Sequence, residues 1–143
     1  MNNFRLRAKL AGRPHYAEFY AKGHPLNGLE ITTSIIKSFV HDVRQQYKEP
    51  VVIIFATKED LEFYKKTQQW TYQTLMKELD INNIFYLNFG QYLLEYLDQR
   101  DIVEVFQSVW GGHYNEEGNQ VVANFVYAHI KPLVLKQTNK QEQ

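Results

Sequence analysis

The 143-residue sequence contains no cysteine, which excludes disulfides, thiolate metal sites and a cysteine nucleophile. Its 16 Lys and Arg residues are balanced by 16 Asp and Glu residues, so there is no electrostatic basis for bulk nucleic-acid binding. It has no apolar run of about 18 residues that could span a bilayer. The N-terminus lacks the apolar core of a signal peptide. As written, the chain is expected to be cytoplasmic; if an N-terminal part is missing, its localisation is unknown.

Hydrophobic residues make up 44% of the chain and aromatic residues 15%, which favours a globular protein over a disordered one. The length allows one domain at most. The histidines have no metal-ligand spacing, so we expect no metal and no cofactor. Three regions are expected: an irregular basic and aromatic segment at 1–28, an α/β domain at 29–135 and a polar tail at 136–143.

The first region mixes basic and aromatic side chains without a regular period. Such a mixture can bind single-stranded nucleic acid, but no nucleic-acid-binding motif accompanies it. The simpler interpretation is an irregular segment packed against other structure. His24–Gly28 reads as a turn, because Pro25 and the Asn27-Gly28 pair favour bends.

Helices and strands alternate from about Glu30 onward, which is typical of α/β folds. Apolar residues at three- and four-residue steps predict a helix at 30–47 with a broad buried stripe: Ile31, Ile35, Ile36, Phe39, Val40, Val43 and Tyr47. The continuously apolar stretches 51–56 and 84–88 predict strands covered on both faces. Between them, Thr57 is expected to cap a helix that is interrupted near Thr67. A right-handed crossover then makes the two strands parallel.

Further along, residues 91–97 predict a short helix and 101–106 a small helix or irregular segment. Lys131-Pro132 is expected to end the last helix. Two strands alone cannot form a stable sheet that is covered on both faces. We therefore expect the N-terminal segment, an oligomeric partner or a missing N-terminal half to complete the sheet.

The most informative stretch is Trp110–Ala123. Gly111 and Gly112 permit a sharp bend before His113. Asn115 then suits the N-cap of an amphipathic helix, and two glutamates occupy its first turn, where negative charge is favoured. This helix is expected to bury one stripe: Val121, Val122, Phe125, Val126, His129 and Ile130.

The segment Gly-His-Tyr-Asn-Glu-Glu-Gly-Asn-Gln-Val-Val-Ala resembles the last conserved block of the SGNH (GDSL-type) hydrolases. The resemblance implies that His113 is the general base that activates a serine for attack on an ester or acetyl ester. It also implies a partial three-layer α/β/α fold with a short parallel sheet, in which 51–56 and 84–88 are the last two of five parallel strands. The chain has no Gly-Asp-Ser block, and Trp110 and Gly111 stand where the family usually has an aspartate. The resemblance covers only the C-terminal portion of the hydrolase domain of this family.

A histidine base requires a nucleophile within hydrogen-bond reach and an oxyanion hole. Ser34, Ser38 and Ser108 lack the sharp turn that exposes such a nucleophile. The carboxylates that could orient His113 are Asp101 and Glu104, although the simpler interpretation is that both are solvated surface groups. Glu59-Asp60 follows a strand end, where α/β sheets bind ligands, yet it also fits ordinary charge at a helix start. Trp110 and Tyr114 either line a substrate pocket or anchor the loop.

The sequence thus supports two hypotheses. In the first, the chain is the C-terminal part of an SGNH-type hydrolase of an ester or acetyl ester and is inactive without a nucleophile-bearing N-terminal part. In the second, it is a non-catalytic remnant or protein-interaction module of the same fold.

Overall fold

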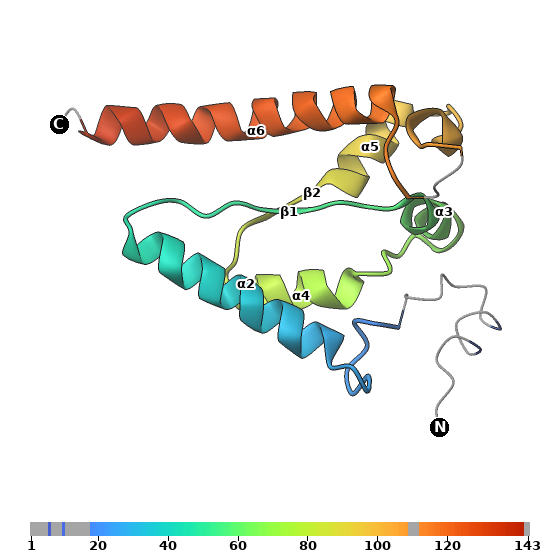
Figure 1. The fold of residues 1–143 in the computed structure, drawn as a ribbon, viewed down its shortest axis with the longest axis horizontal. Coiled ribbons are helices and arrows are strands. Elements are labelled where there is room, and N and C mark those ends of the chain that lie inside the picture. The colour runs from blue at the N-terminus through green and yellow to red at the C-terminus, as the bar shows by residue number, and fades with distance from the viewer. Residues whose placement is uncertain (1–5, 7–9, 11–17, 109–111, 142–143) are drawn as a thin grey trace.

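The structure, a computed structural model, describes residues 6, 10, 18–108 and 112–141, the last seven of them by backbone alone. It contains helices and a short parallel sheet, so the chain has a mixed α/β fold (Figure 1). Its elements are α2 (Gly28–Gln45), β1 (Val52–Ile54), α3 (Lys58–Thr67), α4 (Gln73–Ile81), β2 (Tyr86–Asn88), α5 (Phe89–Leu97), the 3-10 helix η1 (Ile102–Val105) and α6 (Glu116–Gln141). Figure 1 shows α2 and α4 on one side of the strands and α5 and α6 on the other.

The two strands pair in parallel, with Val52 opposite Tyr86 and Ile54 opposite Asn88. This arrangement confirms the predicted parallel pairing of the two strands. Both strands are shorter than expected, however, and all of their residues are only half-buried. Phe55 and Phe85 are exposed. Helices lie on both sides of the strands, as expected, but burial is incomplete because a sheet of two strands leaves its outer edges open.

Between the strands, the predicted helix start at Thr57 and the predicted break near Thr67 are both confirmed. Thr57 caps α3 through a capping box: its side chain accepts from the Asp60 N–H at 3.3 Å, and Asp60 accepts from the Thr57 N–H at 2.8 Å. The helix ends at Thr67, where Gln68 takes a left-handed conformation at φ 57°. The predicted turn at His24–Gly28 is also present, closed by the Asn27 N–H bond to the His24 carbonyl at 2.8 Å.

Helix α2 does not bury the whole of its apolar stripe, contrary to the sequence-based expectation. Leu29 and Val40 are buried, whereas Ile31, Ile35 and Phe39 are 53%, 64% and 46% exposed. The buried residues lie on the side where α2 packs against α4. Nothing among the described residues covers the other half of the stripe.

Helix α6 continues through Pro132 to Gln141, so the predicted end at Lys131-Pro132 is wrong. Proline removes one backbone donor and introduces a clash with the preceding turn, but it leaves the following residues free to resume helical angles. Most residues beyond it are good helix formers. Part of the segment expected to be a polar tail is therefore helical backbone.

Phe89 connects the strands to the helices above them. It follows β2 directly and is fully buried. Its ring lies 5.5 Å from that of Phe55, 5.6 Å from Tyr114 and 5.1 Å from Phe125, measured between centroids. One side chain thus contacts the end of β1, the segment before α6 and α6 itself.

We expect Phe89→Ala to lower the free energy of unfolding by about 3–5 kcal/mol, since it removes a large buried ring and leaves a cavity. Urea denaturation monitored by circular dichroism measures the change. Phe85→Ala is the matched control: Phe85 is 51% exposed and should cost far less. Equal losses in the two variants would contradict the central position of Phe89.

Candidate functional site

His113 lies on the loop between η1 and α6, at the carboxyl end of β1, and its side chain is exposed. The neighbouring Gly112 has φ 99°, a conformation that side-chain-bearing residues rarely adopt, and a Cβ added there would lie 3.9 Å from the Thr57 Cβ. The loop therefore passes close to the first residues after β1. The predicted glycine bend holds at Gly112, while Trp110 and Gly111 lie outside the described residues.

Backbone pairing fixes the position of His113. Phe106 and Tyr114 form an isolated antiparallel bridge. Beside it, the Gln107 N–H donates to the His113 carbonyl at 2.9 Å, and the Asn115 N–H donates to the Val105 carbonyl at 3.1 Å. These bonds close the loop at its base, so the imidazole projects from a defined backbone.

Tyr114 anchors this loop to the sheet. Its hydroxyl donates to the carbonyl of Ala56, just after β1, and its ring stacks on Phe106 with centroids 5.0 Å apart. Burial raises the pKa of the Tyr114 hydroxyl above its usual value, and the charge of Asp60 adds to the shift. Tyr114 is therefore a neutral donor. Its proposed role in substrate binding stays a prediction, as does that of Trp110.

Asn115 caps α6, as the sequence predicts. Its side-chain oxygen accepts from the Gly118 N–H at 2.9 Å, and its amide group donates to the Glu104 carbonyl at 2.6 Å. Gly118 has no room for a side chain, since an added Cβ would lie 2.3 Å from the Val105 carbonyl oxygen. The close approach of α6 to η1 thus depends on this glycine.

An ion pair and a hydrogen bond tie the first turn of α6 to the end of α5. Arg100 contacts Glu117 at 2.8 Å, and the Tyr96 hydroxyl donates to the same carboxylate oxygen at 3.0 Å. Hydrogen bonding from Arg100 and then from Tyr96 lowers the pKa of Glu117. Arg100 and Glu117 are both surface groups. Their ion pair therefore orients α6 but adds little to the stability of the fold.

The carboxylates considered as partners of His113 are engaged elsewhere. Asp101 accepts from the Val103 N–H at 3.0 Å as the cap of η1. Glu104 accepts from the Asp101 N–H at 3.1 Å and pairs with Arg100 at 3.3 Å. Within residues 18–108 and 112–141, no hydrogen bond or ion pair holds the His113 ring.

Asp60 is more deeply embedded than sequence reasoning indicated. It is buried, and it accepts from the Thr57 hydroxyl at 2.9 Å and from the Thr71 hydroxyl. The expectation of ordinary charge at a helix start is confirmed by its capping box. The contact with Thr71 had no sequence signal, because it depends on the turn between α3 and α4.

The candidate serines are not brought into a recognisable catalytic arrangement. Ser34 and Ser38 are exposed on α2, which lies on the opposite side of the strands from α6 (Figure 1). Ser108 is exposed just before the undescribed part of the loop. The part of the chain that the structure describes holds no cluster of three or more His, Asp or Glu residues fit for a metal ion. In that same part, no helix combines the length and apolar character required to cross a membrane.

We expect Tyr114→Phe to lower the free energy of unfolding by about 1 kcal/mol, because it removes the hydrogen bond to the Ala56 carbonyl. Urea denaturation measures this loss, and Tyr47→Phe is the control because Tyr47 is 99% exposed. The folded state keeps Tyr114 protonated above pH ~10, where an unfolded tyrosine ionises. The contribution is thus complete below that pH and declines above it. A stability difference that grows at alkaline pH would contradict the anchoring role.

Models of protein families, curated proteins and solved structures were all compared with the chain, and none of them matches. A functional assignment therefore depends on the residues and geometry of the chain itself. The feature available for that purpose is an exposed histidine on an anchored loop at the carboxyl end of a parallel sheet.

Proposed function

We propose that this chain is the C-terminal part of an SGNH-type hydrolase that acts on an ester or acetyl ester, with His113 as the general base. The nucleophile comes from an N-terminal part or partner that completes the sheet. In this proposal the helices on the two sides of β1 and β2 are part of a three-layer α/β/α arrangement with additional parallel strands.

The position of His113 is the observation that carries this proposal. Ligands of open α/β sheets bind at the carboxyl ends of the strands, and His113 lies at that end of β1. Its exposure leaves the imidazole accessible to a hydroxyl and to a substrate. The bonds of Tyr114 and Asn115 hold the loop in place, as a base that transfers protons to a defined atom requires.

In this proposal the chain supplies only the general base of the reaction. The neutral imidazole of His113 takes the proton from the attacking serine hydroxyl and then gives it to the departing alkoxide. The serine and the donors that stabilise the tetrahedral oxyanion belong to the added part. A carboxylate of that part also supplies the orientation of the ring, since Asp101 and Glu104 are engaged elsewhere.

One observation favours a second candidate, a non-catalytic protein-interaction module of the same fold. The His113 ring has no partner within the described residues, while apolar side chains on α2 are well exposed. A protein that has lost its catalytic role keeps its packing surfaces but no longer needs an oriented histidine.

Hydrolysis of p-nitrophenyl acetate distinguishes the two candidates. The assay is run on this chain alone and on its mixture with the polypeptide encoded immediately upstream. We expect turnover only in the mixture, and His113→Ala should reduce it by about 10²–10⁴-fold, the usual contribution of a general base. His41→Ala is the control, because His41 is exposed on α2.

Turnover by the isolated chain that survives His113→Ala would refute the hydrolase proposal. Absence of turnover in the mixture, with both polypeptides folded by circular dichroism, would support the interaction module. Turnover in the mixture that is lost in His113→Ala and kept in His41→Ala would refute the module.

A further inference from the structure

The chain leads into the His113 loop from η1 and leaves it at α6, and one side chain contacts both of these elements. The Arg100 Nη1 lies 3.3 Å from the Glu104 Oε2 on η1 and 2.8 Å from the Glu117 Oε1 in the first turn of α6. Glu104 precedes His113 in the chain, and Glu117 follows it. The guanidinium therefore bridges the two ends of the loop.

Neighbouring groups hold this guanidinium in place. Its central carbon lies 4.7 Å from the centroid of the Tyr96 ring, so the cation is stacked on an aromatic face. The Tyr96 hydroxyl donates at 3.0 Å to the same Glu117 oxygen that Arg100 contacts. The Arg100 backbone N–H donates to the Leu97 carbonyl at 2.8 Å, at the end of α5. The bridge thus begins from a fixed backbone.

Asn115 makes a second link between the same two elements. Its side-chain amide donates to the Glu104 carbonyl at 2.6 Å, and its side-chain oxygen accepts from the Gly118 N–H at 2.9 Å. Glu104 belongs to η1, and Gly118 lies in the first turn of α6. Arg100 therefore reinforces, through side chains at the surface, a connection that Asn115 makes close to His113.

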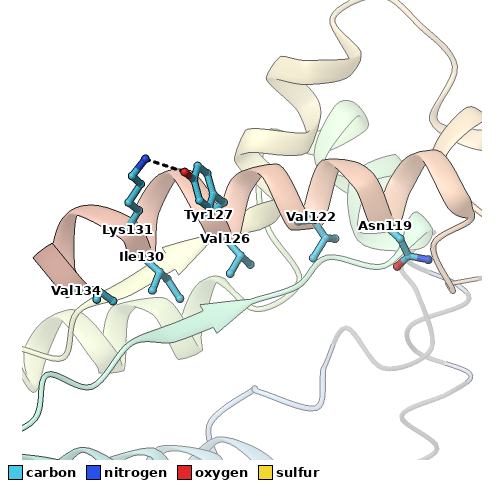
Figure 2. A pocket seen from close by; sticks show the side chains of 8 residues that line it. Asn119, Val122, Val126, Tyr127, Ile130, Lys131 and Val134 are labelled. Atoms are coloured by element: carbon cyan, nitrogen blue, oxygen red, sulfur yellow. Dashed lines mark hydrogen bonds between the residues drawn. The ribbon is translucent and has the colours of Figure 1, made fainter.

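The contacts farther along α6 are of a different kind. Figure 2 shows Val122, Val126 and Ile130 in a row along the helix, and the first two pack against the core. Hydrophobic burial is non-directional, so it sets the position of a helix less sharply than a charged hydrogen bond does. The bond from Lys131 to the Tyr127 hydroxyl in the same figure joins two residues of α6 and links the helix to no other element.

We propose that Arg100 is a positioning residue for His113. By joining η1 to the first turn of α6, it holds together the two backbone segments from which the His113 loop projects. Arginine suits this role, because its planar guanidinium stacks on an aromatic ring while it donates to carboxylates.

The exposure of the bridge separates this role from a role in folding. The Arg100, Glu104 and Glu117 side chains are 40%, 42% and 41% exposed. Exposed ion pairs contribute little to global stability and are screened by salt. Opening the bridge therefore changes the base of the loop while the protein stays folded.

This inference rests on the proposed function in one respect, since it takes His113 as the base of the reaction. A base acts only within hydrogen-bond reach of the hydroxyl that it deprotonates. A small displacement of the base therefore lowers the rate of the chemical step more than it lowers substrate binding. The bridge itself belongs to this chain and is measured without turnover.

Amide hydrogen exchange of the full chain, followed by NMR, tests the bridge separately from catalysis. The Gln107 and Asn115 N–H groups form the two backbone bonds at the base of the His113 loop. We expect Arg100→Gln to speed exchange at both amides by about threefold, the effect of losing surface ion pairs on a local opening. The Ile84 N–H, in the turn before β2, should exchange at an unchanged rate.

Lys22→Gln is the matched control, because Lys22 pairs with Glu78 on α4 at 3.3 Å, on the other side of the strands from α6 (Figure 1). It should leave exchange at Gln107 and Asn115 unchanged. Sodium chloride at about 1 M screens exposed ion pairs, so it should speed exchange at these amides in the unmodified chain but not in Arg100→Gln. Equal exchange in Arg100→Gln and the unmodified chain would overturn the inference.

Two carboxamide variants separate bridging from the local role of each carboxylate. Glu104→Gln keeps an oxygen for the Asp101 N–H, since glutamine also completes a capping box, and Glu117→Gln keeps an acceptor for the Tyr96 hydroxyl. If Arg100 bridges the two elements, either substitution opens the bridge, and the double variant exchanges about as fast as either single variant. Effects that multiply in the double variant would show two independent contacts and would overturn the inference.

Steady-state kinetics of p-nitrophenyl acetate hydrolysis in the mixture test the consequence for His113. Arg100→Gln should lower kcat by about tenfold and leave KM unchanged, because it displaces the base and touches no substrate group. Lys22→Gln should change neither constant. An unchanged kcat in Arg100→Gln, in a mixture that His113→Ala inactivates, would overturn the inference. Faster exchange in Arg100→Gln without any turnover in the mixture would instead support the bridge and refute the proposed function.

Discussion

The packing of Phe89 is the contact on which the described structure depends. This ring lies where β2 ends and α5 begins, and it contacts Phe55 after β1, Tyr114 after His113 and Phe125 on α6. Segments distant in sequence meet around one buried aromatic side chain, which contributes more to stability than any surface ion pair. The candidate site has its position because its loop is built onto this cluster.

The loop at His113 combines a rigid base with an exposed tip. The Tyr114 hydroxyl donates to the Ala56 carbonyl. The Asn115 side chain accepts from the Gly118 N–H in the first turn of α6 and donates to the Glu104 carbonyl. The buried Asp60 supports the same region through Thr57. His113 projects from this framework without a partner among the described residues. The backbone at His113 is therefore fixed, whereas no hydrogen bond among these residues sets the orientation of its ring.

Several features could be predicted from the sequence because they depend on neighbouring residues. The caps at Thr57 and Asn115 and the break after Thr67 involve side chains and backbone groups within a few positions of one another. The parallel pairing of the strands follows from the helical connection between them, which returns the chain to the same end of the sheet. The continuation of α6 past Pro132 was missed, since a proline weakens a helix locally but does not forbid the turns beyond it.

The sequence by itself determined the order of helices and strands, the turn at Gly112 and the histidine that follows it, because each depends on local backbone preference and capping. Only the tertiary structure decided which apolar residues are covered. Periodicity marks the stripes of α2 and α6 as apolar, but it cannot say whether enough neighbouring chain exists to bury them. Ile35 and Val40 belong to the same predicted stripe, and one is 64% exposed while the other is 5% exposed. The difference arises because burial depends on contacts between distant segments, which no local pattern encodes.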